Sequence, residues 1–368
     1  MVDFKRSSFQ PNYAVPPGET LGETLNALGM TQVELAERTG RPKKTISEII
    51  SGKAAITAET ALQLERVLGV PASFWNNLER NYRETLARLK EETQLLTHQA
   101  WLKNFKISTL AKLGWLPKDD SPVKKLRALL NYFGVASIEQ WESIWQNPEA
   151  TYRTSVAFQR NPYMVAAWLR KGEIEAQKIE CYPYKAHLFK DALKKLYRLT
   201  TTPSEVFETK IKTLCAESGV AVVFVQELPG TRVYGATRWL NANKALIQLS
   251  LRGKTDDHLW FTFFHEAAHI LLHGKYDFFI EATDKDSRAK TIIDKEKEAD
   301  RFAQDFLIPA GEYNSLIQKG NFTLSAIQKF AHKLGIAPGI VIGRLQHDKT
   351  IPFSKGNKLK KQFRFSEV

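Results

Sequence analysis

The chain has 368 residues, of which 43% are hydrophobic and 25% charged, as in an ordinary globular protein long enough for two or three domains. Lys and Arg (53) outnumber Asp and Glu (40), and the net charge of +13 is compatible with a nucleic-acid partner. With only two cysteines, Cys181 and Cys215, a disulfide-stapled secreted protein is excluded. No apolar run approaches the roughly 20 residues that span a bilayer, and residues 1–20 lack a signal-peptide core. We therefore expect a cytoplasmic protein with no membrane partner.

Residues 16–85 predict five short helices separated by tight turns, and the second and third form the layout of a helix-turn-helix. Thr31 and Glu34 have the spacing of a capping box at the start of the second helix, and Gly40 ends that helix. The third helix follows Pro42. This layout is typical of domains that place the later helix in the major groove of DNA.

The start of the second helix and the exposed side of the third supply the candidate DNA contacts. Lysines can bind guanine or phosphate, a glutamine can bind phosphate, and a glutamate can accept a hydrogen bond from cytosine. The candidates are Gln32, Lys43, Lys44, Thr45, Ser47, Glu48 and Lys53. The alternative for this block is a five-helix domain that only dimerises.

Residues 86–204 continue with helical patterns divided by turn signals, for example at 121–134 and 161–179. They contain no metal-ligand or nucleophile constellation. A helical linker and a partner-binding region therefore both remain open for this segment.

Residues 205–345 predict an α+β domain, because the apolar period changes near residue 219. Three short β-branched or aromatic runs predict a small antiparallel sheet, and the 3.6-residue period of helices then returns. The remaining residues, 346–368, form a basic tail, and the last 18 of them predict a mobile, loop-like segment. The fold class we expect is thus mostly α and multidomain, with a helix-turn-helix domain, a helical middle region and a C-terminal α+β domain.

The run LWFTFFHEAAHILLHG contains the HExxH pattern of a zincin-like site. His265 and His269 are four residues apart, so they project from one face of a helix and can bind one Zn²⁺ ion. Glu266 lies beside that face, where it can take a proton from a water molecule as the catalytic base. His273 continues the stripe and is expected to support the site or cap the helix; a third imidazole ligand is the alternative.

A third protein ligand is expected from the next helix, at 294–309. Glu296 and Asp300 are four residues apart, so one can bind the metal while the other holds the far nitrogen of a histidine. The spacing does not say which of the two binds the metal, and we expect Glu298 to face solvent. The alternative is a charged helix start that is favoured only by the helix dipole.

HEAAH, the later EKEADRFA with its following LIP, and the lead-in GATRWLNANKALIQLS together resemble the ImmA/IrrE metallopeptidases over about residues 205–345. The resemblance implies zinc bound by His265, His269 and Glu296, with Glu266 as the general base, and it leaves the supporting role to Asp300. It also implies cleavage of a regulatory protein. One departure is Asp300, where the family usually has Asn.

Residues 16–85, from PPGETLGETLNALGMTQVELAERTG to TAETALQLERVLGVPASFWNNLERNYRE, resemble HigA-type antitoxins with a Cro/repressor-type helix-turn-helix. This resemblance implies a homodimer that binds double-stranded operator DNA and represses its own operon, often beside a cognate toxin.

Two functions follow from these resemblances. The first is a DNA-binding transcriptional regulator with a zinc-dependent endopeptidase that cleaves a regulatory protein. The second is a non-enzymatic antitoxin or repressor whose peptidase fold senses or binds a partner. An intact Glu266 favours the first, because a binding fold has no chemical need for a base at that position.

Overall fold

The computed structural model describes residues 13–145, 161–273 and 287–365. Contacts divide the chain into two compact units, and most described residues are helical, as predicted. No helix in these ranges is long and apolar enough to cross a membrane.

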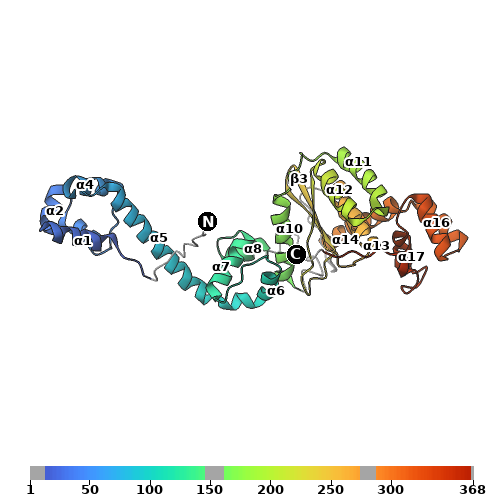
Figure 1. The fold of residues 1–368 in the computed structure, drawn as a ribbon, viewed down its shortest axis with the longest axis horizontal. Coiled ribbons are helices and arrows are strands. Elements are labelled where there is room, and N and C mark those ends of the chain that lie inside the picture. The colour runs from blue at the N-terminus through green and yellow to red at the C-terminus, as the bar shows by residue number, and fades with distance from the viewer. Residues whose placement is uncertain (1–12, 146–160, 274–286, 366–368) are drawn as a thin grey trace, which may run out of the picture. The chain divides into compact units, whose positions relative to one another are not determined.

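The first unit, residues 1–102 with 121–126, holds the five predicted N-terminal helices. Their bounds are α1 Pro17–Leu28, α2 Gln32–Thr39, α3 Lys43–Ile50, α4 Ala58–Leu68 and α5 Ala72–Thr97 (Figure 1). The prediction of five short helices is wrong for the last one, because α5 is 26 residues long and continues into the region 86–204, which was expected to be separate. No glycine or proline interrupts residues 72–97, so nothing in that stretch ends the helix.

Both ends of α2 are fixed by the capping residues that the sequence predicted. The Glu34 N–H donates to Thr31 Oγ1 at 3.2 Å, and the Thr31 N–H donates to Glu34 Oε2 at 2.8 Å. Gly40 follows with a φ of 66°, in the left-handed region that favours glycine. At the other end of α3, a Cβ on Gly18 would lie 2.2 Å from the Ile49 carbonyl oxygen, so α1 approaches α3 through a glycine.

The second unit contains residues 103–120 and 127–368. The helices that follow α5 are η1 Gln99–Asn104, α6 Ile107–Lys112, α7 Pro122–Phe133, α8 Ile138–Trp145, α10 Pro162–Gln177, α11 Ala186–Tyr197, η3 Arg198–Thr201, α12 Ser204–Ala216, α13 Asp256–Leu272, α14 Ser287–Leu307, α15 Ala310–Lys319, α16 Leu324–Leu334, α17 Pro338–His347 and η4 Asn357–Leu359.

Three strands form one sheet in this unit, in the order β1-β3-β2. They are β1 Val220–Phe224, β2 Gly235–Asn241 and β3 Lys244–Leu249. The prediction of an antiparallel sheet is correct for β2 and β3 but wrong for β1, which runs parallel to β3. A short turn connects β2 to β3, so these two strands are antiparallel. Because β3 then lies between β2 and β1 and runs parallel to β1, the sheet is mixed, and β1 and β2 are its two described edges.

Helices cover both faces of the sheet (Figure 1). On one face α10 packs against β1 and β3, and the Gln248 amide donates to the Trp168 carbonyl oxygen at 2.6 Å. On the other face lie α12 and α13, whose apolar side chains share a core with Val222 and Ile247. Although α10 was placed in the middle helical region 86–204, it is thus part of the sheet's packing; the domain boundaries themselves remain a prediction.

The C-terminal segment packs back onto α13, so the expectation of a mobile tail is wrong for residues 351–365. Phe363 is buried, and the Lys361 carbonyl oxygen accepts a hydrogen bond from the Asp256 N–H at 3.0 Å. The Lys360 ammonium lies 2.6 Å from the buried Asp257 carboxylate. A basic composition is compatible with packing here because buried carboxylates at the start of α13 compensate one of the charges.

Candidate metal centre and DNA-facing surface

The helix α13 carries the HExxH pattern into the interior of the second unit. Trp260, Phe263 and Phe264 are fully buried around it, so the helix is held on several sides by apolar contacts. Two polar residues of the same helix are buried with them: His269 is only 2% exposed, and Glu266 is buried as well. Polar groups at this depth need partners or a ligand, because burial without compensation is costly.

Three side chains converge beside α13, and they are those predicted as metal ligands. The Nε2 atoms of His265 and His269 lie 3.0 Å apart, and Glu296 Oε2 on α14 lies 3.0 Å from His265 Nε2. Glu296 Oε1 lies 3.5 Å from His269 Nε2, and the ligand atoms of the three residues all fall within 4.8 Å of one another. α13 and α14 pack side by side, which brings His269 and Glu296 together although 26 residues lie between them in the chain.

A second set of side chains holds the far nitrogens of both histidines. Asp300 Oδ1 lies 2.9 Å from His265 Nδ1, which matches the supporting role expected for it. His273 Nδ1 lies 2.9 Å from His269 Nδ1, and its own Nε2 lies 3.3 Å from Glu298 Oε2. Glu298 is 65% exposed, as expected, but its contact with His273 was not predicted. These contacts fix the orientation of both imidazoles.

The strand β2 lies against the predicted base, Glu266. Thr237 Oγ1 donates to the Glu266 carbonyl oxygen at 3.1 Å, and a Cβ on Gly235 would lie 2.7 Å from Glu266 Oε1. Gly235 is therefore part of the site, since a larger residue there would displace the Glu266 carboxyl group. No pattern in the sequence pointed to it, because Gly235 resembles any glycine inside a short strand.

The electrostatics of the cluster differ between its two histidines. Burial by itself would lower the pKa of His265, but hydrogen bonds with Asp300 and Glu296 outweigh it and raise that pKa to about 10. Burial lowers the pKa of His269 to about 4, so this imidazole is neutral. Burial would raise the pKa of Glu296, but its hydrogen bonds with His265 and His269 lower it to about 2. Without a metal the cluster thus holds a carboxylate, a neutral His269 and a protonated His265 at neutral pH, and His265 must lose its proton to bind a metal.

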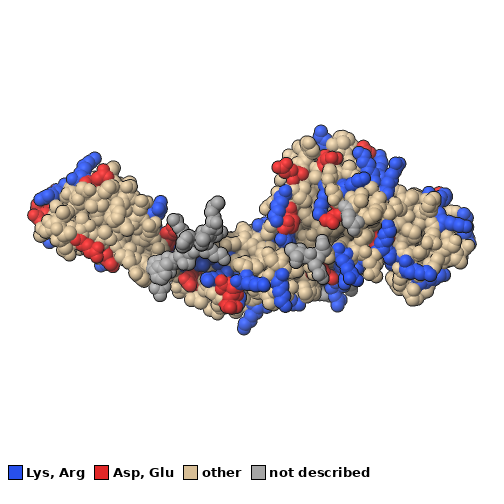
Figure 2. Space-filling view, in the orientation of Figure 1, with Lys and Arg blue, Asp and Glu red and all other residues tan. Residues whose placement is uncertain are grey.

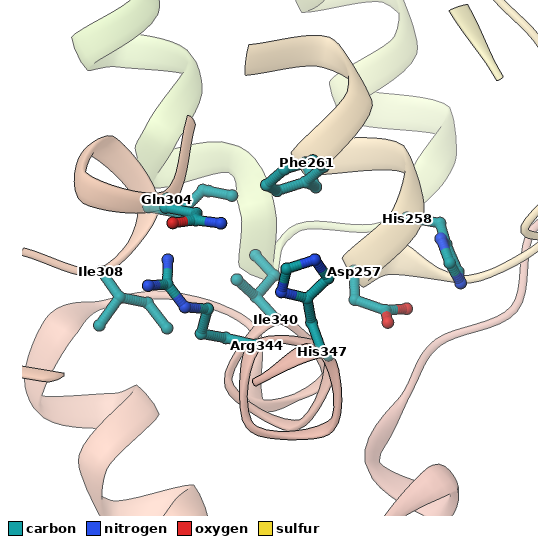
Figure 3. A pocket seen from close by; sticks show the side chains of 10 residues that line it. Asp257, His258, Phe261, Gln304, Ile308, Ile340, Arg344 and His347 are labelled. Carbon is teal, nitrogen blue, oxygen red and sulfur yellow. The ribbon is translucent and has the colours of Figure 1, made fainter. Parts of the chain in front are cut away.

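A cavity of about 110 Å³ lies one helical turn away from the cluster, between α13, α14 and α17 (Figure 3). Phe261 on its wall precedes His265 by one turn, and Gln304 follows Asp300 by one turn. The Arg344 side chain lines this cavity (Figure 3). Its charge is compensated by Asp348, because Arg344 Nε lies 2.6 Å from Asp348 Oδ2. The walls are otherwise mainly apolar, so the cavity suits an apolar group.

The seven candidate DNA contacts lie in the first unit on α2, α3 and the turn after α3. Lys43, Lys44, Ser47 and Lys53 are exposed, as is Gln32 at the first position of α2. Thr45 and Glu48 are half-buried on the same helix α3, and Lys44 Nζ lies 3.8 Å from Glu48. The fully buried Ile46 and the nearly buried Ile49 hold the opposite side of α3 in the core. This arrangement leaves one side of a short helix accessible.

Comparisons with known proteins match the two units separately. A helix-turn-helix family model matches residues 21–75, and the model of the IrrE N-terminal-like domain, a peptidase family, matches residues 219–346.

Curated relatives match the N-terminal part. The uncharacterised helix-turn-helix-type transcriptional regulator YddM of Escherichia coli is 35% identical over 63 residues, which are 17% of this chain and 67% of that protein. The antitoxin HigA-1 of Vibrio cholerae is 34% identical over 85 residues, which are 22% of this chain and 80% of that protein. The chain therefore belongs to the helix-turn-helix regulators. More particularly, it carries a HigA-type helix-turn-helix domain fused to an IrrE-like, metallopeptidase-like domain.

Solved structures of similar chains cover between a fifth and a quarter of this chain. An addiction module antidote protein of the HigA family from Coxiella burnetii is 33% identical, covering 23% of this chain and 92% of that one, with a TM-score of 0.22. The Pseudomonas aeruginosa antitoxin HigA, solved with the higBA promoter, is 28% identical, covering 22% of this chain and 90% of its own, with a TM-score of 0.22.

Proposed function

We propose that this protein is an operator-binding transcriptional regulator that carries a zinc-dependent endopeptidase, and that the peptidase cleaves a regulatory protein. The observation that carries the proposal is the convergence of His265, His269 and Glu296 on one point, next to Glu266.

The donor atoms fit a zinc ion in both number and spacing. Two imidazoles and one carboxylate are a usual ligand set of a catalytic zinc, which keeps a fourth position open. Bonds of about 2.0–2.1 Å in a tetrahedral site place ligand atoms roughly 3.3 Å apart. The separations of 3.0, 3.0 and 3.5 Å among the three side chains agree with that spacing. Zn²⁺ bound there would polarise a peptide carbonyl and lower the pKa of a water molecule.

The protein's own groups supply the remaining roles. Glu266 is buried next to β2, and in this proposal it accepts a proton from water and later passes it to the leaving amine. Asp300 and His273 orient the two ligand imidazoles through their far nitrogens. An edge strand such as β2, with one described neighbour, can hold an extended peptide beside Glu266 by backbone hydrogen bonds.

For the first unit we propose that α3 contacts an operator through the exposed side defined by Lys43, Lys44 and Ser47. The supporting observations are the helix-turn-helix match, the likeness to HigA-type antitoxins and the exposure of these side chains. Such regulators bind palindromic sites as dimers, so we propose a homodimer in the cytoplasm. A cognate toxin is a further proposed partner.

The second candidate function is a non-enzymatic antitoxin or repressor in which the IrrE-like domain only senses or binds a partner. The observation that favours it is the HigA-type N-terminal unit, because antitoxins act by binding. The two candidates differ in whether Glu266 is needed.

The deciding experiment compares Glu266→Gln with His269→Ala in a reporter strain driven by the protein's own promoter, under DNA damage and other stresses. Glu266→Gln keeps both histidines, so it should fold, hold zinc and bind DNA. It removes the base, which typically contributes roughly 10²–10⁴-fold to a rate, so it should fail to relieve repression or to shorten its partner protein. If Glu266→Gln behaves as wild type in every condition while His269→Ala does not, the binding function is correct and the peptidase proposal is wrong.

A further inference from the structure

Solvent reaches α13 along one stripe of its surface. Between positions 257 and 270 most residues of this helix are buried, and the exceptions are His258, Phe261, Thr262 and His265. These four recur at helical spacing, so they lie on one side of α13. The stripe therefore runs from the candidate metal cluster at His265 toward the start of the helix, and it is open on the same side along its whole length.

Different elements flank the two sides of this stripe. β2 lies on one side, because a Cβ on Gly235 would lie 2.7 Å from Thr262 Cγ2. α14 and α17 lie on the other side, where His258 and Phe261 of the stripe line the cavity of about 110 Å³ (Figure 3). An extended peptide that pairs with β2 would therefore have this cavity within reach of its side chains.

Phe261 connects the cavity to the candidate metal cluster. Its ring lines the cavity, and the centre of that ring lies 6.1 Å from the centre of the His265 imidazole. One helical turn rises about 5.4 Å, and two residues of an extended peptide span about 6.6 Å. A substrate side chain in the cavity would therefore belong to a residue one or two positions from the peptide bond at the metal.

The walls of the cavity are mainly apolar. Their apolar side chains are those of Phe261, Leu307, Ile308 and Ile340. The volume of about 110 Å³ is below the roughly 150 Å³ of an apolar cavity that takes up benzene. The cavity therefore suits one aliphatic side chain, such as that of leucine, isoleucine or methionine, better than an aromatic one.

The charged groups at the cavity are already compensated. Arg344 lies 2.6 Å from Asp348, and Asp257 lies 2.6 Å from Lys360. On the visible surface of α10 to α17, basic side chains are spread out with acidic ones among them rather than gathered at one place (Figure 2). An apolar occupant leaves these ion pairs intact, whereas a charged occupant would have to displace one of them.

We infer that this cavity is a specificity pocket of the proposed peptidase, and that it holds an aliphatic side chain of the substrate within two residues of the cleaved bond. The inference rests on the proposed function, because it needs zinc at His265, His269 and Glu296. The substrate it names is an extended polypeptide segment with leucine, isoleucine or methionine at that position. Burial of such a side chain favours binding by roughly fourfold for each methylene group.

Binding of hydroxamic acids to the full-length, zinc-loaded protein tests the inference without any need for cleavage. Acetohydroxamic acid is the anchor, because it chelates zinc and has no chain that could reach the cavity. Straight-chain homologues up to octanohydroxamic acid add methylene groups that can extend past Phe261 into the cavity. In isothermal titration calorimetry, octanohydroxamic acid should bind at least tenfold more tightly than the anchor, since each buried methylene contributes roughly fourfold.

Variants that fill the cavity should remove this gain in affinity. Leu307→Phe and Ile340→Phe each enlarge a side chain of the wall, so octanohydroxamic acid should bind at least tenfold more weakly while acetohydroxamic acid binds as before. Leu188→Phe is the matched control, because Leu188 is an exposed leucine on α11 outside the cavity, and it should retain the gain. Circular dichroism checks the fold, and two filling variants allow for one that does not fold.

A second measurement asks whether the occupant is part of a substrate. Digestion of a mixed peptide library by the zinc-loaded protein, analysed by mass spectrometry, should show leucine, isoleucine or methionine enriched at one position within two residues of the cleaved bond. Leu307→Phe should shift that position to alanine or glycine at least tenfold. Cleavage with no preference at these positions would contradict the inference.

The remaining outcomes separate the specificity pocket from the proposed function. If acetohydroxamic acid does not bind the zinc-loaded protein, the metal centre is wrong, and both proposals fall with it. If the anchor binds but longer chains bring no gain, or if both filling variants keep the gain, the metal centre stands and the specificity pocket is wrong. Equally tight binding of octanohydroxamic acid to zinc-free protein would assign the cavity to a free apolar molecule and would also overturn the inference.

Discussion

The two candidate sites of this protein are built in opposite ways. The candidate DNA-contacting surface of α2 and α3 is local: its residues lie within positions 32–53, and most of them are exposed. The candidate metal cluster is nonlocal and mostly shielded from solvent, since α13 supplies His265 and His269 while α14 supplies Glu296. A local surface depends on the fold of one short segment, whereas a buried cluster depends on two helices packing in one register.

Removing one ligand of the candidate metal cluster should have the largest effect, because it should abolish zinc binding and leave operator binding unchanged. We expect His265→Ala to abolish stoichiometric zinc, because a site with two remaining protein ligands binds weakly. Metal analysis of purified protein measures this, and operator binding in the same preparation should be unchanged because the helix-turn-helix belongs to the other compact unit.

Glu296→Gln and Glu298→Gln form the matched pair for the third ligand. Glu296 lies within 3.0 Å of His265 Nε2, whereas Glu298 is 65% exposed and contacts only His273 of the cluster. Glu296→Gln should therefore lose more zinc than Glu298→Gln. The reverse order would mean that Glu298, and not Glu296, is the metal ligand.

The local surface should respond to the removal of single side chains. Lys44→Ala combined with Thr45→Ala should weaken binding to a palindromic operator by roughly 1–3 kcal/mol for each interaction with a base that is removed. Gel shifts at a stated salt concentration measure the change, and the zinc content serves as the internal control. Unaltered operator affinity would mean that another surface contacts DNA or that this block only dimerises.

Asp256 and Asp257, the buried acidic pair at the start of α13, should make the stability of the second unit depend on pH. Burial, and then the nearby Asp257, raise the pKa of Asp256 from 3.8 to about 6. Since the folded pKa is the higher one, the folded state loses stability as the pH rises from about 4 to about 6, and the loss is complete above that. Asp256→Asn should therefore stabilise the protein by about 1–3 kcal/mol near neutral pH and by little at about pH 4.

Thermal unfolding across this pH range measures the effect. Asp257→Asn is the matched control with the opposite sign, because it breaks the ion pair with the largely buried Lys360. Lower stability of Asp256→Asn near neutral pH would show that the Asp256 carboxylate is stabilised in the folded protein by other means.

The smallest expected effect tests a residue that belongs to the site only through tertiary packing. Gly235→Ala places a methyl group against the Glu266 carboxyl and the Thr262 methyl, so both side chains must shift. We expect zinc to be retained and relief of repression in the reporter strain to fall about tenfold, because misplacing a base by a few tenths of an ångström to about 1 Å costs up to roughly 10² in rate. Full activity of Gly235→Ala would mean that the position of Glu266 is not set by β2.

The sequence by itself determined the features that depend on spacing along one helix. The capping box at Thr31, the left-handed turn at Gly40 and the shared face of His265 and His269 follow from backbone geometry within a few residues. The choice of Glu296 and Asp300 also needed the pattern of a second helix. In the structure both side chains lie beside His265.

Only the tertiary structure decided what depends on partners distant in the chain. Three such features join segments separated by tens of residues. They are the parallel pairing of β1 with β3, the packing of residues 351–365 against α13, and the contact of Gly235 with Glu266. Periodicity specifies which side of an element is buried, but it does not specify which other element covers that side. Strand order, the fate of a basic tail and the neighbours of a glycine are set by which arrangement buries the most apolar surface while satisfying buried polar groups.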